Sequence, residues 1–142
     1  MKTVAQVLEG KNSTVISVAP GSTVLGALEL MAQREVGAVL VLDGPRLAGI
    51  LSERDYARKV ILLGKASKDT LVQEIMTAAL ICVRPEDTID HCMNLMTDKR
   101  VRHLPVLEGE RLVGVVSIGD VVKEMIAEQK FLIEQLEHYI MG

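Results

Sequence analysis

The feature that most constrains this chain is an internal repeat. A shift of 65 positions lays residues 15–59 on residues 80–124 without a gap, so that glycines, prolines and large aliphatic residues coincide. The first copy contains Pro20, Gly44, Gly49, Ser52 and Asp55, and the second has Pro85, Gly109, Gly114, Ser117 and Asp120 at the matching places. Such a period predicts two copies of one supersecondary unit, each of which buries little core alone.

Each copy predicts the order strand, helix, strand, strand, helix. In the first copy a short strand over 15–18 precedes a helix that Ser22 can cap, and two strands follow over 38–42 and 47–51. The second copy predicts strands over 80–83, 104–107 and 112–116, with Asp87 as the helix cap. The last helix of each copy starts at Ser52 or Ser117. We therefore expect a mixed α/β (α+β) fold in which the two copies pack sheet to sheet around a pseudo-twofold axis.

Composition and charge exclude several classes of function. Hydrophobic residues make up 49% of the chain and charged residues 25%, which is too apolar for a disordered protein. The net charge is −3 and Trp is absent, so we expect no nucleic-acid partner. Cys82 and Cys92 lack the spacing of a zinc site and are expected to be reduced core residues. No stretch is long and apolar enough to predict a membrane span, so we expect a cytoplasmic protein.

Three segments of the repeat resemble a known family. They are Arg102-His103-Leu104-Pro105-Val106, the run from Leu112 to Asp120, and its counterpart from Leu47 to Asp55. The chain resembles the CBS domain, named after cystathionine beta-synthase, and looks like a stand-alone CBS pair. The resemblance implies a first motif over 1–71 with an N-terminal helix and linker, a second over 72–126, and a C-terminal helix extension over 127–142.

The segment Ser-x-x-Asp at the start of a helix has two interpretations. The serine and the acid at the third helical position form a capping box, which needs no ligand. A helix N-terminus also attracts phosphate, and a carboxylate accepts hydroxyl donors from a ribose. Because the segment follows Gly-x-x in both copies, it suits a nucleotide as well as a cap.

The resemblance implies two clefts, each shared between the copies. In one cleft, Ser52, Arg54 and Asp55 face Met76, Ala78, Val101, Arg102 and His103. In the other, Ser117 and Asp120 face Ser13, Val36, Gly37 and Ala38. The family places the serine near phosphate and the aspartate on the ribose hydroxyls, and Val36 and Val101 provide apolar surface for adenine. The first copy lacks the basic pair and the proline of the second, so the clefts should differ.

The last helix extends beyond the repeat. Val122, Ile126, Gln129, Ile133, Leu136 and Ile140 follow each other in steps of four and three residues, a heptad-like stripe with one polar break. A stripe that outlasts the repeat favours burial against a second chain, and CBS pairs commonly form dimers. We therefore expect a homodimer.

These features predict a non-enzymatic sensor that binds AMP, ATP, ADP or NAD and signals energy or redox state to an unidentified regulated protein. No catalytic residue, catalytic cofactor or metal site is expected. The alternative is a structural or interaction protein whose nucleotide clefts are vestigial. A small nucleotide hydrolase lacks any activated nucleophile, base or metal cluster in the sequence.

Overall fold

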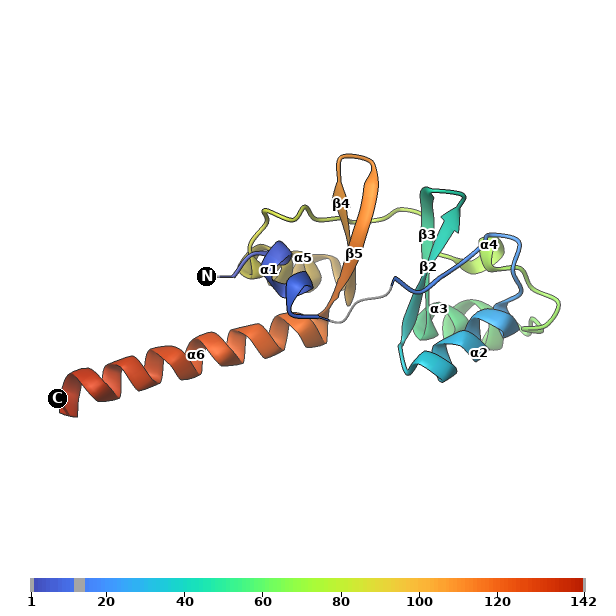
Figure 1. Cartoon of the computed structure of the whole chain (residues 1–142). Coiled ribbons are helices and arrows are strands. Elements are labelled where there is room, and N and C mark those ends of the chain that lie inside the picture. The colour runs from blue at the N-terminus through green and yellow to red at the C-terminus, as the bar shows by residue number, and fades with distance from the viewer. Residues whose placement is uncertain (1, 12–14, 142) are drawn as a thin grey trace. The chain divides into compact units, whose positions relative to one another are not determined.

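The computed structural model describes residues 2–11 and 15–141, which divide into two compact units. The first-copy unit contains residues 15–81 and 110–112, and the second-copy unit contains residues 2–11, 82–109 and 113–141 (Figure 1). The segment that precedes the first copy in sequence therefore belongs to the unit of the second copy. Ser13, which was predicted to bind ligand, lies outside the described residues.

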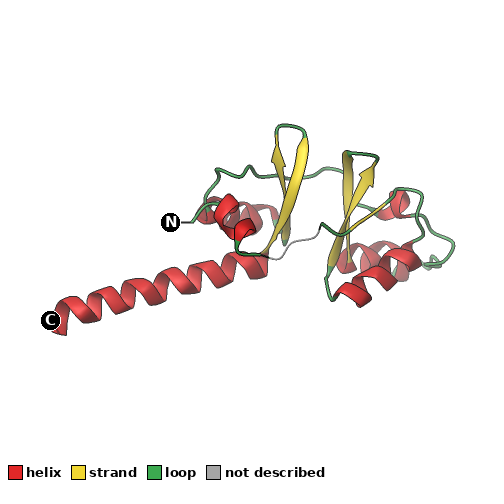
Figure 2. Ribbon diagram, viewed as in Figure 1, coloured by secondary structure: helices red, strands yellow, loops and turns green. Residues whose placement is uncertain are grey.

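The first-copy unit has the predicted order of elements. Its elements are β1 (Ser17–Val18), α2 (Val24–Arg34), β2 (Ala38–Asp43), β3 (Arg46–Ser52), α3 (Glu53–Tyr56), the π-helix η1 (Ala57–Ile61) and α4 (Val72–Ile75). β1 pairs with β2 in parallel and β2 pairs with β3 antiparallel (Figure 2). The β2–β3 turn places Gly44 at a φ of 62°, a conformation that glycine adopts without steric cost.

The second-copy unit repeats this order with one weaker strand. Its elements are α1 (Val4–Glu9), α5 (Ile89–Lys99), β4 (His103–Glu108), all but the first two residues of β5 (Arg111–Ser117), and α6 (Ile118–Met141). Val83 forms a single parallel bridge to Val106, where the first copy has the strand β1. The N–H of Leu40 donates to the Ile16 carbonyl at 3.0 Å, whereas Pro105 at the equivalent place has no N–H to donate. The proline therefore explains why this strand is shorter.

The caps of α2 and α5 correct one prediction. Ser22 and Asp87 were expected to cap these helices, but Thr23 and Thr88 do so. The Thr23 hydroxyl accepts from the Gly26 N–H at 3.1 Å, and Gly26 is the third residue of α2. Threonine can take this role because its side chain carries the same capping oxygen as serine. Asp87 instead accepts from the Arg84 N–H at 2.8 Å in the preceding turn.

Equivalent residues of the two copies form two aliphatic cores. The core of the first-copy unit is built from Val24, Ala27, Met31, Val39, Val41, Leu51, Val60, Val72 and Ile75. Buried residues at matching places of the second copy include Ile89, Cys92, Met96, Leu104, Val106 and Val116. Both cysteines are free thiols, as predicted, and Cys92 is fully buried whereas Cys82 is half-buried. Burial, aided by the charge of Asp87, raises the pKa of the Cys92 thiol to about 11.

Two short helices complete the units in the same way. The segment between the two repeated copies contains α4, whose Val72 and Ile75 are buried in the core of the first-copy unit. A Cβ atom on Gly49 would lie 2.8 Å from Met76 Sδ, and one on Gly114 would lie 2.9 Å from Leu8 Cδ2. Both positions therefore require glycine, because a side chain near the end of a short helix approaches closely: Met76 after α4 at Gly49, and Leu8 of α1 at Gly114.

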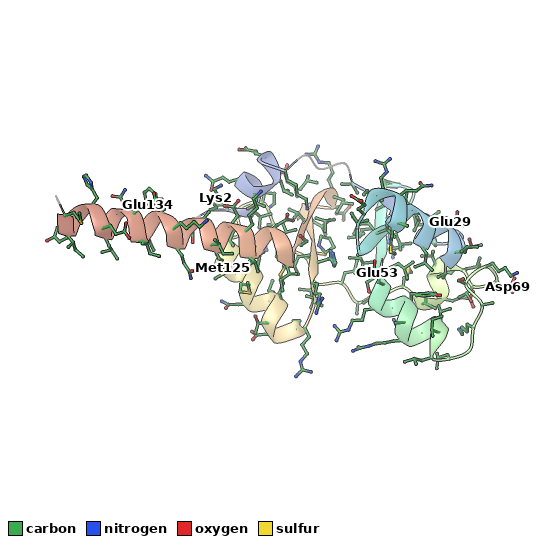
Figure 3. The ribbon with its side chains drawn as sticks, turned by 90° about the horizontal axis from the view of Figure 1, so that it is seen from below. Lys2, Glu29, Glu53, Asp69, Met125 and Glu134 are labelled. Carbon is green, nitrogen blue, oxygen red and sulfur yellow. The ribbon has the colours of Figure 1, made fainter. Side chains whose placement is uncertain are left out.

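α6 runs far beyond the contacts that hold its first turns. Near its start, Val121 is buried, and Lys2 Nζ lies 3.0 Å from Glu124 Oε2. Figure 3 shows Glu134 on the extended part of the helix, which continues the direction of the first turns. Its 24 residues correspond to a length of about 36 Å. Among the described residues, no helix combines the length and apolarity that crossing a membrane requires.

Candidate functional site

The Ser-x-x-Asp segments form capping boxes in both units. The Asp55 N–H donates to Ser52 Oγ at 3.1 Å, and the Ser52 N–H donates to Asp55 Oδ2 at 3.1 Å. In the second copy the Asp120 N–H donates to Ser117 Oγ at 3.2 Å, and the Ser117 N–H donates to Asp120 Oδ2 at 2.9 Å. The capping interpretation is therefore confirmed. It fixes each aspartate at the start of a helix that follows a strand.

Asp55 has further partners inside the first-copy unit. The Thr77 hydroxyl donates to Asp55 Oδ1 at 3.1 Å, and Lys59 Nζ lies 3.2 Å from the same oxygen. Lys59 also donates to the carbonyl of Ile75 at 3.0 Å. Asp55 and Thr70 are the two buried polar residues among the described residues. The Asp55 carboxylate is surrounded by the Lys59 ammonium and the hydroxyl groups of Ser52 and Thr77.

Asp120 is paired with a lysine from a distant part of the sequence. Lys11 Nζ lies 2.7 Å from Asp120 Oδ2 and donates to the carbonyl of Val115 at 3.0 Å. Each lysine therefore binds one aspartate and one backbone carbonyl. Lys59 comes from the same helical region as its aspartate, whereas Lys11 follows α1.

Positive charge gathers around Asp120. Burial alone would raise the pKa of the Asp120 carboxyl, but the Lys11 ammonium and the hydrogen bonds from Ser117 outweigh it, so this pKa lies below its usual value. Burial, followed by the charges of Lys11 and Arg102, lowers the pKa of His103 against the opposite effect of Asp120. The charges of Lys11, Arg102 and Asp120 therefore all act on the pKa of His103.

The start of the middle strand is tied to the serine segment in each unit. The Ile118 N–H donates to the Arg102 carbonyl at 2.8 Å, and the Glu53 N–H donates to the Gly37 carbonyl at 3.0 Å. The predicted residues Arg102 and His103 therefore lie beside Ser117 and Asp120 within one unit. Gly37 and the adjoining Ala38 lie beside Ser52 and Asp55 in the other.

The remaining predicted residues lie close to these segments in sequence. Val36 and Val101 are half-buried and follow Glu35 and Arg100, whose φ values of 56° and 55° are left-handed. Met76 packs against Gly49, while Ala78 and Arg54 are exposed. The predicted pairing of each aspartate with residues of the other copy stays a prediction.

Sequence reasoning missed Lys11, Lys59 and Thr77. Lys59 was detectable, because it stands four residues after Asp55 on a predicted helix. Lys11 and Thr77 follow the short helices, which match each other at a shift of 68 rather than 65, so the gap-free repeat did not include them. In the described residues, no group of three or more His, Cys, Asp or Glu side chains could hold a metal ion.

Comparison with known proteins gives one consistent family. The model of the CBS domain matches residues 4–61 and 72–127. The chain is 45% identical over 125 residues to the mitochondrial CBS domain-containing protein CBSX3 of Arabidopsis thaliana, covering 84% of this chain and 61% of that protein. A solved structure of a protein with CBS domains from Burkholderia ambifaria MC40-6 is 51% identical, covers 90% of this chain and 96% of that chain, and has a TM-score of 0.87.

A more distant solved structure shares the fold alone. It is the CBS domain pair of protein MJ0100 in complex with 5′-methylthioadenosine and S-adenosyl-L-methionine, at 20% identity and a TM-score of 0.79. The match covers 89% of this chain and 98% of that chain.

Proposed function

This chain belongs to the CBS domain family, and from this premise we propose that it is a non-enzymatic regulatory module that binds an adenosyl ligand. The observation that carries the proposal is the duplicated Gly-x-x-Ser-x-x-Asp segment, which places an aspartate at the start of a helix in each unit, with a lysine beside it. Lys59 Nζ lies 3.2 Å from Asp55 Oδ1, and Lys11 Nζ lies 2.7 Å from Asp120 Oδ2. AMP and NAD are the proposed ligands.

The chemistry of the pair suits the ribose and phosphate of a nucleotide. A carboxylate accepts hydrogen bonds from two ribose hydroxyls, and an ammonium group binds phosphate as a point charge. The first N–H groups of α6 add the partial positive charge of a helix N-terminus. In this proposal Ser52 and Ser117 lie near phosphate, Asp55 and Asp120 bind ribose, and Val36 and Val101 contact adenine. Arg54 and Arg102 add positive charge, His103 offers a ring N–H to phosphate, and Ser13, Gly37, Ala38, Met76 and Ala78 line the ligand.

The bound compounds of a structural relative support the ligand class. The solved CBS domain pair of MJ0100 holds two compounds that share an adenosine group. A regulatory role further requires that the ligand bind two states of the protein unequally, since equal affinity shifts no population.

Nucleotide titration tests the proposal. Native mass spectrometry of freshly purified protein should show retained adenine nucleotide, and AMP or NAD should raise the melting temperature. Ligand at 100 times its dissociation constant should add about 2.7 kcal/mol of stability. GMP serves as the matched control because it keeps ribose and phosphate but changes the base. If AMP, ADP, ATP and NAD all leave the melting temperature unchanged, the sensor function is wrong.

One observation favours the alternative, a structural or interaction protein with vestigial clefts. The carboxylates of Asp55 and Asp120 already accept hydrogen bonds from their own capping boxes and pair with lysines. A carboxylate satisfied inside its unit needs no ligand. The same titration separates the two functions, because vestigial clefts would not respond to any adenine nucleotide.

We further propose that residues 127–142 serve a homodimer and that the protein acts in the cytoplasm on a regulated partner. Ile133, Leu136 and Ile140 are all more than half exposed. Leaving such side chains in water forgoes roughly 1.5 to 3 kcal/mol for each of them. Cell fractionation tests the compartment, and light scattering tests the dimer.

A further inference from the structure

We propose that Lys11 makes the Asp120 site selective for phosphorylated adenosine ligands over uncharged nucleosides. The inference rests on the proposed function, because it concerns the ligand class of the same site. It assigns a specificity role to a residue that lies outside the repeated segments and was not among the predicted ligand residues.

The position of Lys11 is fixed by contacts within the second-copy unit. Its ammonium lies 2.7 Å from Asp120 Oδ2 and 3.0 Å from the carbonyl oxygen of Val115. The side chains of Lys11 and Asp120 are one third and one fifth exposed, so solvent screens this pair only in part. α1 holds the segment in place, since its Leu8 packs where Gly114 leaves room on β5.

The ammonium and a ribose would compete for the same carboxylate. Asp120 Oδ2 already accepts from the Ser117 N–H at 2.9 Å in addition to Lys11. A ribose diol that donates to Asp120 therefore has to displace Lys11 or share the oxygen with it. A displaced ammonium in a half-buried site is costly unless it finds another anion.

A phosphorylated ligand supplies that anion and a nucleoside does not. The flexible four-carbon stem of lysine lets the ammonium move from a carboxylate to a nearby phosphate. Arg102 and His103 lie beside the start of the same helix, because the Ile118 N–H donates to the Arg102 carbonyl at 2.8 Å. The charges of Lys11, Asp120 and Arg102 all act on the pKa of His103. Uncharged adenosine would gain the carboxylate but leave Lys11 without a counter-charge, so its binding should be weaker.

The Asp55 site provides an internal contrast. Its lysine comes from the π-helix η1, and the equivalents of Arg102 and His103 are Gly37 and Ala38. Asp55 is also more buried than Asp120, with side-chain exposures of 12% and 21%. Arg102 and His103 therefore have no polar counterparts at the start of the middle strand of the first-copy unit, and the proposal concerns the Asp120 site alone.

The test measures the dissociation constants of AMP and adenosine by isothermal titration calorimetry. The Asp120 site is identified as the one whose binding is lost in Asp120→Asn. In the unmodified protein AMP should bind this site more tightly than adenosine. Lys11→Gln should reduce that preference about tenfold, which corresponds to the loss of one charge-assisted hydrogen bond. Lys11→Arg should keep the preference, because it restores the cation.

Lys2→Gln is the matched control, since Lys2 lies on the same N-terminal segment but pairs with Glu124 at 3.0 Å. It should leave the ratio of the two constants unchanged. The proposal is overturned if Lys11→Gln weakens AMP and adenosine equally, which would indicate only a structural role. Binding of neither compound to the unmodified protein would overturn the proposed function together with this inference. Binding with an unchanged ratio would overturn this inference alone.

Discussion

At the scale of single residues, two equivalent aspartates have different surroundings. Asp55 accepts from Thr77 and pairs with Lys59, both from the first-copy unit. Asp120 pairs with Lys11, which precedes the repeat in sequence. Both aspartates also complete a capping box with the serine that caps the helix. A substitution at either place therefore removes a structural interaction and a proposed ligand contact together, and the two effects need separate measurements.

The first prediction concerns Asp55→Asn and Asp120→Asn. Each should weaken the adenine nucleotide at one site by roughly 1.5 to 3 kcal/mol, because the amide replaces a charged acceptor of ribose hydroxyls. Calorimetry gives the affinity and stoichiometry, and urea denaturation gives the stability. Asp98→Asn is the control, since Asp98 is exposed near the end of α5. Unchanged affinity and stoichiometry in both variants would show that the aspartates act as caps only.

The second prediction concerns pH. Burial and the nearby cations Lys11 and Arg102 lower the pKa of His103 below 6.5, so the unfolded chain binds a proton at this residue more readily than the folded one. The free energy of unfolding should therefore fall as the pH drops from about 6.5 through the folded pKa of His103. Asp120, whose pKa is also lowered, adds a second loss as the pH drops from about 3.8 through its folded pKa.

Urea denaturation at several pH values measures this dependence. His103→Gln should flatten the curve between pH 7 and 5 and leave the acid limb in place. His138→Gln is the control, because His138 is exposed in the last turn of α6. A slope that survives in His103→Gln would assign the loss of stability to another group.

Among the helices and strands, α1 and α4 occupy equivalent places, because each packs on the last strand of one copy. α1 precedes the first copy and packs on β5, whereas α4 precedes the second copy and packs on β3. In both helices the side chain of the third residue accepts from the backbone N–H just before the helix: Gln6 Oε1 from the Thr3 N–H at 2.9 Å and Glu74 Oε2 from the Leu71 N–H at 2.6 Å. The short helix that stands before each copy in the sequence thus belongs to the unit of the other copy.

The third prediction follows from the glycines beneath these helices. Gly49→Ala should cost about 1 to 3 kcal/mol, because its Cβ would lie 2.9 Å from the backbone oxygen of Thr77 as well as close to Met76. Gly114→Ala should cost less, since the clash is with the flexible end of Leu8. Denaturation of the single and double variants forms a cycle.

Leu8→Ala should recover part of the stability lost in Gly114→Ala, because it removes the atoms that the new methyl group meets. Gly21→Ala is the control, since a Cβ there meets nothing within 4 Å. Additive costs of Leu8→Ala and Gly114→Ala would show that the two residues do not share the contact.

Much of the fold follows from the sequence because the repeat fixes its register. The two strand pairs around Gly44 and Gly109 and the helices α2 and α5 were predicted, since turn residues and apolar spacing are local signals. The packing of α1 on the second copy and of α4 on the first was not predicted, because helices of six and four residues carry almost no periodicity. The pairing of Lys11 with Asp120 spans 109 residues, and no local pattern indicates it.

At the scale of the whole molecule, the extension of α6 is the feature that its own unit does not explain. The predicted stripe is helical as far as Ile140, and Ile126, Ile133, Leu136 and Ile140 are all at least about half exposed. Phe131, Leu132 and Tyr139 are exposed on the same stretch. Monomeric proteins rarely expose a contiguous apolar surface of this kind, so a partner is expected to cover it.

The fourth prediction is that truncation after Glu128 converts a homodimer into a monomer. Val121, the residue of α6 that is buried, lies before the cut, and so does Glu128, whose Oε1 accepts from the Lys2 N–H at 3.2 Å. The truncated protein should therefore keep its melting temperature at low concentration and its nucleotide binding.

Leu136→Lys in the full chain should have the same effect on mass as the truncation. Glu134→Lys is its control, because it changes charge on the same stretch without removing apolar surface. Light scattering measures the mass of each. A truncated protein that stays dimeric would place the interface on the repeated elements, because the apolar end of α6 would then be dispensable, and a monomeric full-length chain would contradict the dimer itself.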